Sequence, residues 1–467
     1  MYIGQVQQKK LFNGMLLIDL VNPTDQLYIL EKNIDWKKLE NDLSVYYDPY
    51  FGAKAKPIRL MAAMLILKYI KRYSDKELIY QCTTNYAVQH FIGYKNLSKK
   101  PPCDRSLLSV FRKRIGKEGC EILFRESIRI HGKKAIKDLE DAVIIDSTVQ
   151  EKYTSYPTDI NLAIDTIRQI WKIGDKFSIK FRNKHKKEVK KLRKDALFNK
   201  SNKKNEIKEK ILKELRNIGL KLLNELKIHL PDSVTNSVKF DEICNNYYRA
   251  LTQKKDDKNK IYSIFESQIY CVAKGKMNKT YEFGTKVSLA CGKYNRIIYY
   301  VSSEDENIHD SKTLPNIISN IKANFGIVPK YCIVDKGYQG RKKYDSAQII
   351  IAKNNLDDIN PEDKKELVEH LNRRSDIEEI ISHMKNDYLL SKNRLRDRIG
   401  DQINPIICAA ASNFMVFARD EQKRLLRLEA RKKSGRKKKV KRSPRRTTRG
   451  VPFEVPNKQI YPSIFSI

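Results

Sequence analysis

Two aspartates follow short apolar runs, at points where a sheet could present carboxylates to a ligand. Residues 143–145 (VII) lead into Asp146, and residues 332–334 (CIV) lead into Asp335. Runs of this composition predict buried strands that end at the aspartates, and strand ends are where open α/β sheets bind ligands. One such aspartate is typical of a turn cap. Two of them, with the acidic helix described next, indicate a carboxylate pair for a hard divalent cation.

A third acid lies on a predicted helix between two bases. In residues 372–387 (NRRSDIEEIISHMKND), Arg374, Glu378 and Lys385 stand at i, i+4 and i+11. A rotation of about 100° per residue brings all three close to one helix face. This layout suits a metal-bound phosphate, because the carboxylate binds the cation and the bases bind phosphate oxygens. The alternative is a surface helix with i,i+4 ion pairs. Glu379 is the rival for the acid role, about 100° away from this face.

Three carboxylates from two strands and a helix, Asp146, Asp335 and Glu378, predict a site for two Mg²⁺ ions, which Mn²⁺ can replace. Two such ions, about 4 Å apart, clamp the attacking and leaving oxygens of an in-line phosphoryl displacement. We therefore expect these three residues to be both metal ligands and catalytic residues, with Arg374 and Lys385 binding phosphate.

The beginning of the chain is predicted to be mostly helical. A buried helix follows Pro57, a capping box at Ser74 starts a second helix, and Asp104 caps a third over residues 105–116. Short helices with a basic last member suit a helix-turn-helix-like head that binds DNA. An ordinary bundle with a solvated charged face is the alternative. We expect three bases of the third helix on its exposed side: Arg112, Lys113 and Arg114.

A mixed sheet interrupted by a helical block is predicted for the middle of the chain. Residues from about 160 to 265 form a Lys-rich, mostly helical insertion after the first strand. Its bases could contact phosphates, and a solvated amphipathic hairpin is the alternative. From residue 268 onwards the pattern predicts three antiparallel strands, a helix, the strand before Asp335 and one further strand. The predicted fold class is therefore α/β.

The charge balance indicates a polyanionic partner. The 467 residues contain 93 Lys and Arg against 56 Asp and Glu, a formal net charge of +37. A chain this basic repels itself unless it lies against a polyanion. Nucleic acid is the first candidate and an anionic membrane surface the second. No apolar run predicts a transmembrane helix, no signal-peptide layout is present, and no Cys or His residues stand at zinc spacing. We expect a reduced, cytoplasmic protein.

The C-terminal tail is the most basic stretch. Residues 423–449 contain fifteen Lys and Arg and one acid, a composition that cannot bury a core and predicts disorder in the free chain. We expect the tail to contact phosphates without regard to base sequence, through bases that include Arg436, Lys437 and Lys438.

Several of these motifs together resemble those of bacterial DDE insertion-sequence transposases. The R-x₃-E-x₆-K segment formed by Arg374, Glu378 and Lys385 resembles the signature of the insertion sequence four and five groups. The blocks VIIDSTV…YPTD, YEFGTKVSLA, HDSK and CIVDKGYQG resemble those of the five group, in the same order. The resemblance covers most of residues 40–420. The family pattern has a Tyr three residues before the Arg, where this chain has Leu371.

The resemblance implies a ribonuclease-H-like catalytic core in which Asp146, Asp335 and Glu378 bind the metal ions. Arg374 and Lys385 would then hold DNA phosphates, and the block that contains His309 and Asp310 would lie near the site. The expected activity is DNA transposition, which means cleavage at the ends of an insertion sequence and joining of the 3′-OH ends to target DNA. A ribonuclease-H-like nuclease or resolvase without joining activity, and an inactive DNA-binding relic, are the alternatives.

The resemblance also implies partners and a domain plan. The partners are double-stranded DNA, as terminal inverted repeats and as target, and a second copy of the chain in a homodimer; no membrane is expected. Three domains are predicted: a helical DNA-binding domain over 1–135, the DDE core over 136–420 with its insertion, and a basic tail over 421–467. The expected location is the bacterial cytoplasm, at the nucleoid.

Overall fold

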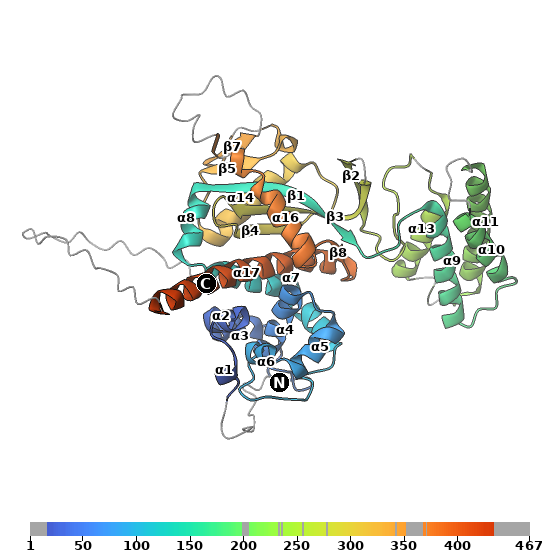
Figure 1. The fold of residues 1–467 in the computed structure, drawn as a ribbon. Helices are drawn as coiled ribbons and strands as arrows, with labels where there is room; N and C mark the ends of the chain where they lie inside the picture. The colour runs from blue at the N-terminus through green and yellow to red at the C-terminus, as the bar shows by residue number, and fades with distance from the viewer. Residues whose placement is uncertain are drawn as a thin grey trace, which may run out of the picture.

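The computed structural model describes residues 16–198, 205–231, 234, 237–254, 256–276, 279–340, 343–351, 368–369 and 371–433. A central sheet with its covering helices lies above a helical head, and a bundle of helices extends to one side as an arm (Figure 1). The tail bases Arg436, Lys437 and Lys438 lie outside the described residues.

The described strands form one mixed sheet in the order β2-β3-β1-β5-β7-β6, with β4 paired to β3 and β8 paired to β1. β1 is antiparallel to β3 and parallel to β5, and β5 is parallel to β7. The predicted α/β class is confirmed at this level. The bounds are β1 (Ala142–Lys152), β2 (Tyr270–Lys276), β3 (Lys279–Gly292), β4 (Ile298–Ser303), β5 (Tyr331–Val334), β6 (Lys343–Tyr344), β7 (Ala347–Ile351) and β8 (Lys392–Asn393).

The first strand is longer than the sequence predicts. The expectation that it ends at Asp146 is wrong, because β1 continues to Lys152 and Asp146 lies inside it. Residues 147–151 pair in antiparallel register with β3, from Ser147 opposite Ser288 to Glu151 opposite Gly284. Asp is depleted in strands, so the local pattern stops at residue 145. The neighbouring strand supplies the hydrogen bonds that carry β1 further.

The head consists of short helices around one buried helix, α4. Its eleven buried residues confirm the predicted helix after Pro57, and Ser74 caps α5 by accepting a hydrogen bond from the Glu77 N–H. The last helix, α7, does not end at Gly116 as predicted but kinks there, at φ 61°, and continues. The helices are α1 (Leu17–Leu20), α2 (Gln26–Asn33), α3 (Trp36–Ser44), α4 (Ile58–Lys71), α5 (Asp75–Thr84), α6 (Tyr86–Phe91) and α7 (Leu107–Arg129).

One hydrophobic core joins the head to the sheet. The long helix α17 (Asp397–Lys433) packs against α2, α4 and α7 of the head and against β4 of the sheet. Its small residues 409–411 are buried, which permits this close approach. The predicted tail boundary at 420/421 falls within α17. The other helices of the core are α8 (Lys133–Asp141), α14 (Asp310–Phe325), the 3₁₀ turn η2 (Lys336–Tyr338) and α16 (Asp376–Asp387).

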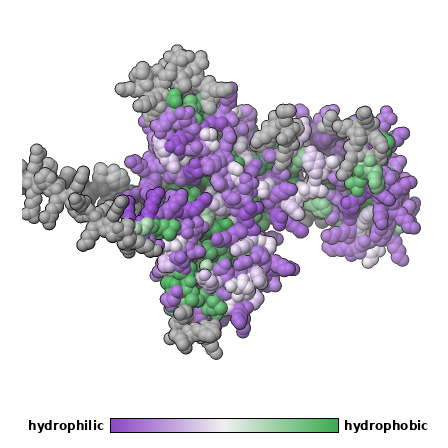
Figure 2. Space-filling model, in the orientation of Figure 1, coloured by the Kyte–Doolittle hydropathy of each residue, from purple (hydrophilic) through white to green (hydrophobic). Residues whose placement is uncertain are grey.

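The arm has a separate core. Its inward residues, among them Ile167, Leu215 and Leu222, form their own apolar cluster, and its outer surface is mostly hydrophilic (Figure 2). Its helices are α9 (Asp159–Lys176), α10 (Lys186–Phe198), α11 (Asn205–His229) and α13 (Val238–Thr252). Over the described residues, no helix combines the length and the apolarity needed to cross a membrane.

Candidate active site

Asp146 lies on β1, and Asp335 directly follows the neighbouring parallel strand β5. In the register of β1 and β5, Ile144 is opposite Ile333. Asp146 is two residues further along β1, and Asp335, whose backbone is still extended, is two residues beyond Ile333. Side chains alternate between the faces of a sheet, so both carboxylates lie on the same face, and neighbouring strands are about 4.8 Å apart. The fully buried apolar runs before them, residues 143–145 and 332–334, hold this register. The two acids are therefore adjacent.

The turn after Asp335 brings in a further carboxylate. The Asp335 side chain caps η2 by accepting a hydrogen bond from the Gly337 N–H. A methyl group on Gly337 would lie 3.1 Å from Asp335 Oδ1 and 3.3 Å from Asp310 Oδ2. Glycine thus lets the backbone pass close to both carboxylates. Asp310, which the sequence places only near the site, lies beside Asp335.

Arg374 connects two of the predicted acids. Its Nη2 lies 3.2 Å from Asp335 Oδ2, and its Nη1 lies 3.7 Å from Glu378 Oε1. Arg374 lies two residues before α16, next to its N-cap Ser375, and the i,i+4 spacing brings the side chains of Arg374 and Glu378 together. The rival acid Glu379 instead pairs with Arg296, at 2.9 Å. Lys385 lies in the last turn of α16 and is half-buried.

Two further residues support this cluster: Lys286, in the YEFGTKVSLA block, and Tyr338, in the CIVDKGYQG block. These blocks indicate the region of the site, but no local pattern predicts a role for either residue. Lys286 on β3 is buried, donates to the Ile308 carbonyl at 2.7 Å and lies 3.1 Å from Asp310 Oδ1. Tyr338 is 1% exposed, and its hydroxyl lies beside Thr313. Burial raises the pKa of Tyr338, and the nearby carboxylates of Asp310 and Asp146 raise it further. The Tyr338 hydroxyl therefore stays protonated and can donate.

The donor set suits a hard divalent cation. Among the described residues no three His, Cys, Asp or Glu side chains form a ready cluster for one ion, since the Arg374 guanidinium contacts Asp335 and Glu378 is 65% exposed. Carboxylate oxygens are nevertheless the ligands that Mg²⁺ prefers, and Gly337 leaves a space between Asp335 and Asp310. Asp146, Asp335 and Glu378 are the residues that would hold such an ion.

Two families match the chain in the segments that build this architecture. Residues 16–114 match the family described as "Transposase domain (DUF772)", and residues 250–414 match "Transposase DDE domain". Together they form a pattern typical of the insertion sequence four and five groups. The chain belongs to the DDE transposases of insertion sequences. Asp335 and Glu378 of this transposase lie inside the second matched segment, whereas Asp146 lies before it, separated by the arm.

A relative of this transposase comes from Rhizobium meliloti, where it is called "Uncharacterized protein ORF8 in nfe locus". It is 29% identical over 168 residues, which cover 36% of the transposase and 81% of the relative. No solved structure matches the chain significantly.

The predicted bases of the head differ in their surroundings. The expectation that Arg112 lies on the exposed side of α7 is wrong, because it is 6% exposed and lies 3.8 Å from Asp75, which also pairs with Lys68. Packing of α7 against the head turns this side chain inward. Lys113 and Arg114 are exposed, and the Arg114 guanidinium stacks on the Tyr47 ring at 4.5 Å. Of the three bases, two are accessible to solvent.

Proposed function

We propose that this transposase cleaves the DNA strand at the ends of its element and joins the freed 3′-OH to target DNA. The observation that carries the proposal is the register that brings Asp146 on β1 next to Asp335 at the end of the parallel strand β5, with Arg374 linking Asp335 to Glu378. The strand order β4-β3-β1-β5-β7, antiparallel and then parallel, supports a ribonuclease-H-like core. All three acids being present argues against an inactive relic.

The chain's own residues bind and orient the scissile phosphate. Two bound divalent ions, Mg²⁺ or Mn²⁺, would stabilise the charge on the attacking and leaving oxygens. Asp146, Asp335 and Glu378 would hold them. Arg374 and Lys385 bind phosphate oxygens through charge-assisted hydrogen bonds. Because Arg374 also contacts Asp335, it releases that carboxylate when it turns to the phosphate. In the joining step a terminal 3′-OH takes the place of water in the same site. Its oxygen bonds to a phosphorus of the target strand, and the P–O3′ bond of that strand breaks to release a new 3′-OH.

The remaining parts position the DNA. We assign recognition of terminal inverted repeats to the head (1–135), with Lys113 and Arg114 as phosphate contacts, and catalysis to residues 136–420. Two element ends must be handled together, so the active complex is a homodimer. Its place of action is the bacterial cytoplasm, at the nucleoid.

A cleavage-and-joining assay tests the proposal. The substrates are DNA that carries the ends of the source element, intact or pre-cleaved, with Mg²⁺ present and wild type compared with Asp335→Asn. We expect wild type to cut intact ends and join pre-cleaved ends, and the variant to bind DNA without cutting it. Cleavage without joining would assign the protein to the nucleases instead, and cleavage by the variant would overturn the role of Asp335.

A further inference from the structure

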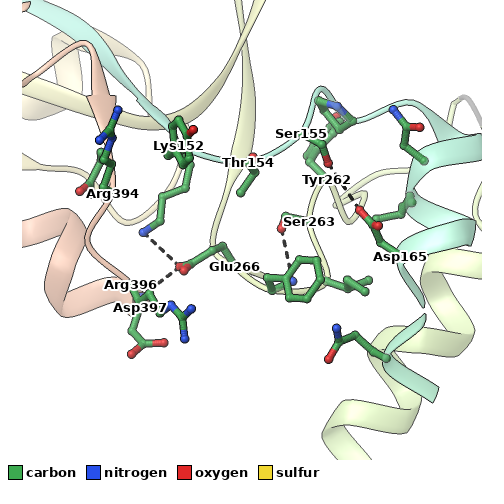
Figure 3. A pocket seen from close by; sticks show the side chains of 18 of the residues that line it. Lys152, Thr154, Ser155, Asp165, Tyr262, Ser263, Glu266, Arg394, Arg396 and Asp397 are labelled. Atoms are coloured by element: carbon green, nitrogen blue, oxygen red, sulfur yellow. Dashed lines mark hydrogen bonds and ion pairs between the residues drawn. The ribbon is translucent and has the colours of Figure 1, made fainter. Parts of the chain in front are cut away.

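A cleft of about 670 Å³ opens beside the far end of β1. Its walls come from residues 152–157, helix α9, residues 262–266 and residues 393–397, and Figure 3 shows Arg394 and Lys152 on one side with Asp165 on the other. Lys152 is six residues beyond Asp146 on the same strand, a distance of about 20 Å. A continuous strand thus connects the active site to the cleft.

The cleft carries an excess of positive charge. Lys172, Arg394 and Arg396 are exposed, and in the part of the chain that the structure describes no carboxylate lies within ion-pair distance of them. The carboxylates on the walls are mostly neutralised, because Asp165 lies 3.1 Å from Arg168 and Glu266 lies 3.0 Å from Lys152. Lys172, Arg394 and Arg396 therefore outnumber the one exposed acid of the cleft, Asp397. The charge favours an anionic ligand.

Exposed aromatic rings stand beside these bases. Tyr153 is 62% exposed, and the Arg394 guanidinium lies 4.8 Å from the centre of its ring. Phe265, on another wall, is 55% exposed. Bases that bind phosphate and aromatic rings that stack on nucleobases are the combination used for unpaired nucleic acid. The volume suits a nucleotide-sized ligand and is too small for a duplex.

A buried polar network holds the walls in place. Lys152 Nζ lies 2.8 Å from Asp401 Oδ1, and the Asn393 side chain donates to the same oxygen at 2.6 Å. Gln268 donates to both Glu266 and Asp401. The network ties the end of β1, the 262–266 segment and the 393–397 segment together. The cleft is therefore preformed, which lowers the cost of ordering a ligand in it.

We propose that this cleft binds an unpaired stretch of the DNA strand that passes through the active site. The phosphates contact Lys172, Arg394 and Arg396, and a base stacks on Tyr153. The inference rests on the proposed function for the identity of the polyanion, and it adds a site for single-stranded DNA that strand cleavage alone does not require.

Binding of a labelled strand tests the cleft without catalysis. The full chain, in a chelator, is titrated into a short fluorescein-labelled oligothymidylate and into the duplex that this strand forms with oligoadenylate. Tyr153→Ala should weaken binding of the single strand at least about fivefold, the lower bound for loss of one stacked base. Tyr153→Phe should bind as wild type does. Binding of the duplex should not change in either variant.

The charge contribution is measured by salt dependence. On a single strand, each phosphate contact makes the slope of log K against log salt more negative by about 0.7. Arg394→Gln combined with Arg396→Gln should therefore make this slope less negative by about 1.4. The matched control removes two exposed bases of α8, Lys133→Gln with Lys137→Gln, and should leave the slope for the single strand nearer to that of wild type.

Unchanged binding of the single strand by both cleft variants would overturn the inference, as would equal losses for strand and duplex. These outcomes are separate from failure of the proposed function. If wild type cuts and joins DNA while the cleft variants bind the single strand as wild type does, only the inference about the cleft is refuted. If wild type never cuts DNA, but the cleft still discriminates the single strand from the duplex, only the proposed strand cleavage is refuted.

Discussion

The guanidinium of Arg374 lies 3.2 Å from the carboxylate of Asp335, and it also reaches Glu378 at 3.7 Å. Arg374 thus offsets part of the negative charge that Asp146, Asp310 and Asp335 concentrate at the site, and Lys286 pairs with Asp310. The contact of Arg374 also sets the distance between the β5 end and α16, the two elements that carry Asp335 and Glu378. Substitution of single residues at this site can therefore measure what each of them contributes to cleavage and to stability.

Arg374→Gln should reduce strand cleavage by at least about a hundredfold, because one charged donor to the reacting phosphate is lost. The free energy of unfolding should change by less than about 1 kcal/mol, since the ion pair is partly exposed. Single-turnover cleavage and urea unfolding measure the two effects. Arg373→Gln is the control, because Arg373 pairs with Asp376 on the surface. Equal losses in both variants would contradict a phosphate-binding role.

Gly337→Ala should slow cleavage by about tenfold or more with little change in Tm. The new methyl group would lie 3.1 Å from Asp335 Oδ1 and 3.3 Å from Asp310 Oδ2, so the carboxylates must shift by a few tenths of an ångström. Displacements of about 1 Å cost about a hundredfold in rate. The neighbouring exposed residue supplies the control, Lys336→Ala. Wild-type rates in Gly337→Ala would mean that these carboxylates need not be positioned so closely.

Lys152→Met should lower the free energy of unfolding by about 3–5 kcal/mol at pH 7, because Glu266 and Asp401 remain buried without their base. Burial raises the pKa of Asp401, and Lys152 lowers it. A raised pKa in the folded state means that stability is lost as pH rises through it. Without Lys152 this pKa rises further, so the deficit should be larger at pH 7 than at pH 5. Urea unfolding at both pH values checks this, and equal deficits would contradict it.

Arg112 and Lys113 should separate stability from DNA binding in the head. Arg112→Met should cost about 1–3 kcal/mol of unfolding free energy, since it leaves the partly buried Asp75 with one base fewer. Lys113→Gln should change stability by no more than about 0.5 kcal/mol. If Lys113 contacts a phosphate, its loss should lower the salt-dependence slope for duplex DNA by about 0.9. An unchanged slope would remove Lys113 from the DNA interface.

The local pattern predicts the features that depend on nearby residues. Apolar runs before Asp146 and Asp335 mark buried strands, and the 3.6-residue period places Arg374 beside Glu378. The features it misses depend on contacts far apart in the sequence. β1 continues past Asp146 only because β3 pairs with it, and Arg112 is buried only because α7 packs into the head. Nothing in the residues next to Lys286 indicates that its side chain will form an ion pair with Asp310.

Asp146 is the most informative residue of the site to test. It lies outside the matched DDE segment, and its place in the site is inferred from strand register. We would therefore measure single-turnover cleavage of end DNA by Asp146→Asn beside Asp335→Asn and Glu378→Gln, with Glu379→Gln as control. This assignment of the three acids predicts that the first three variants bind DNA and lose cleavage by at least about a hundredfold, while Glu379→Gln cleaves as wild type does. Wild-type cleavage by Asp146→Asn, or loss in Glu379→Gln with retention in Glu378→Gln, would contradict it.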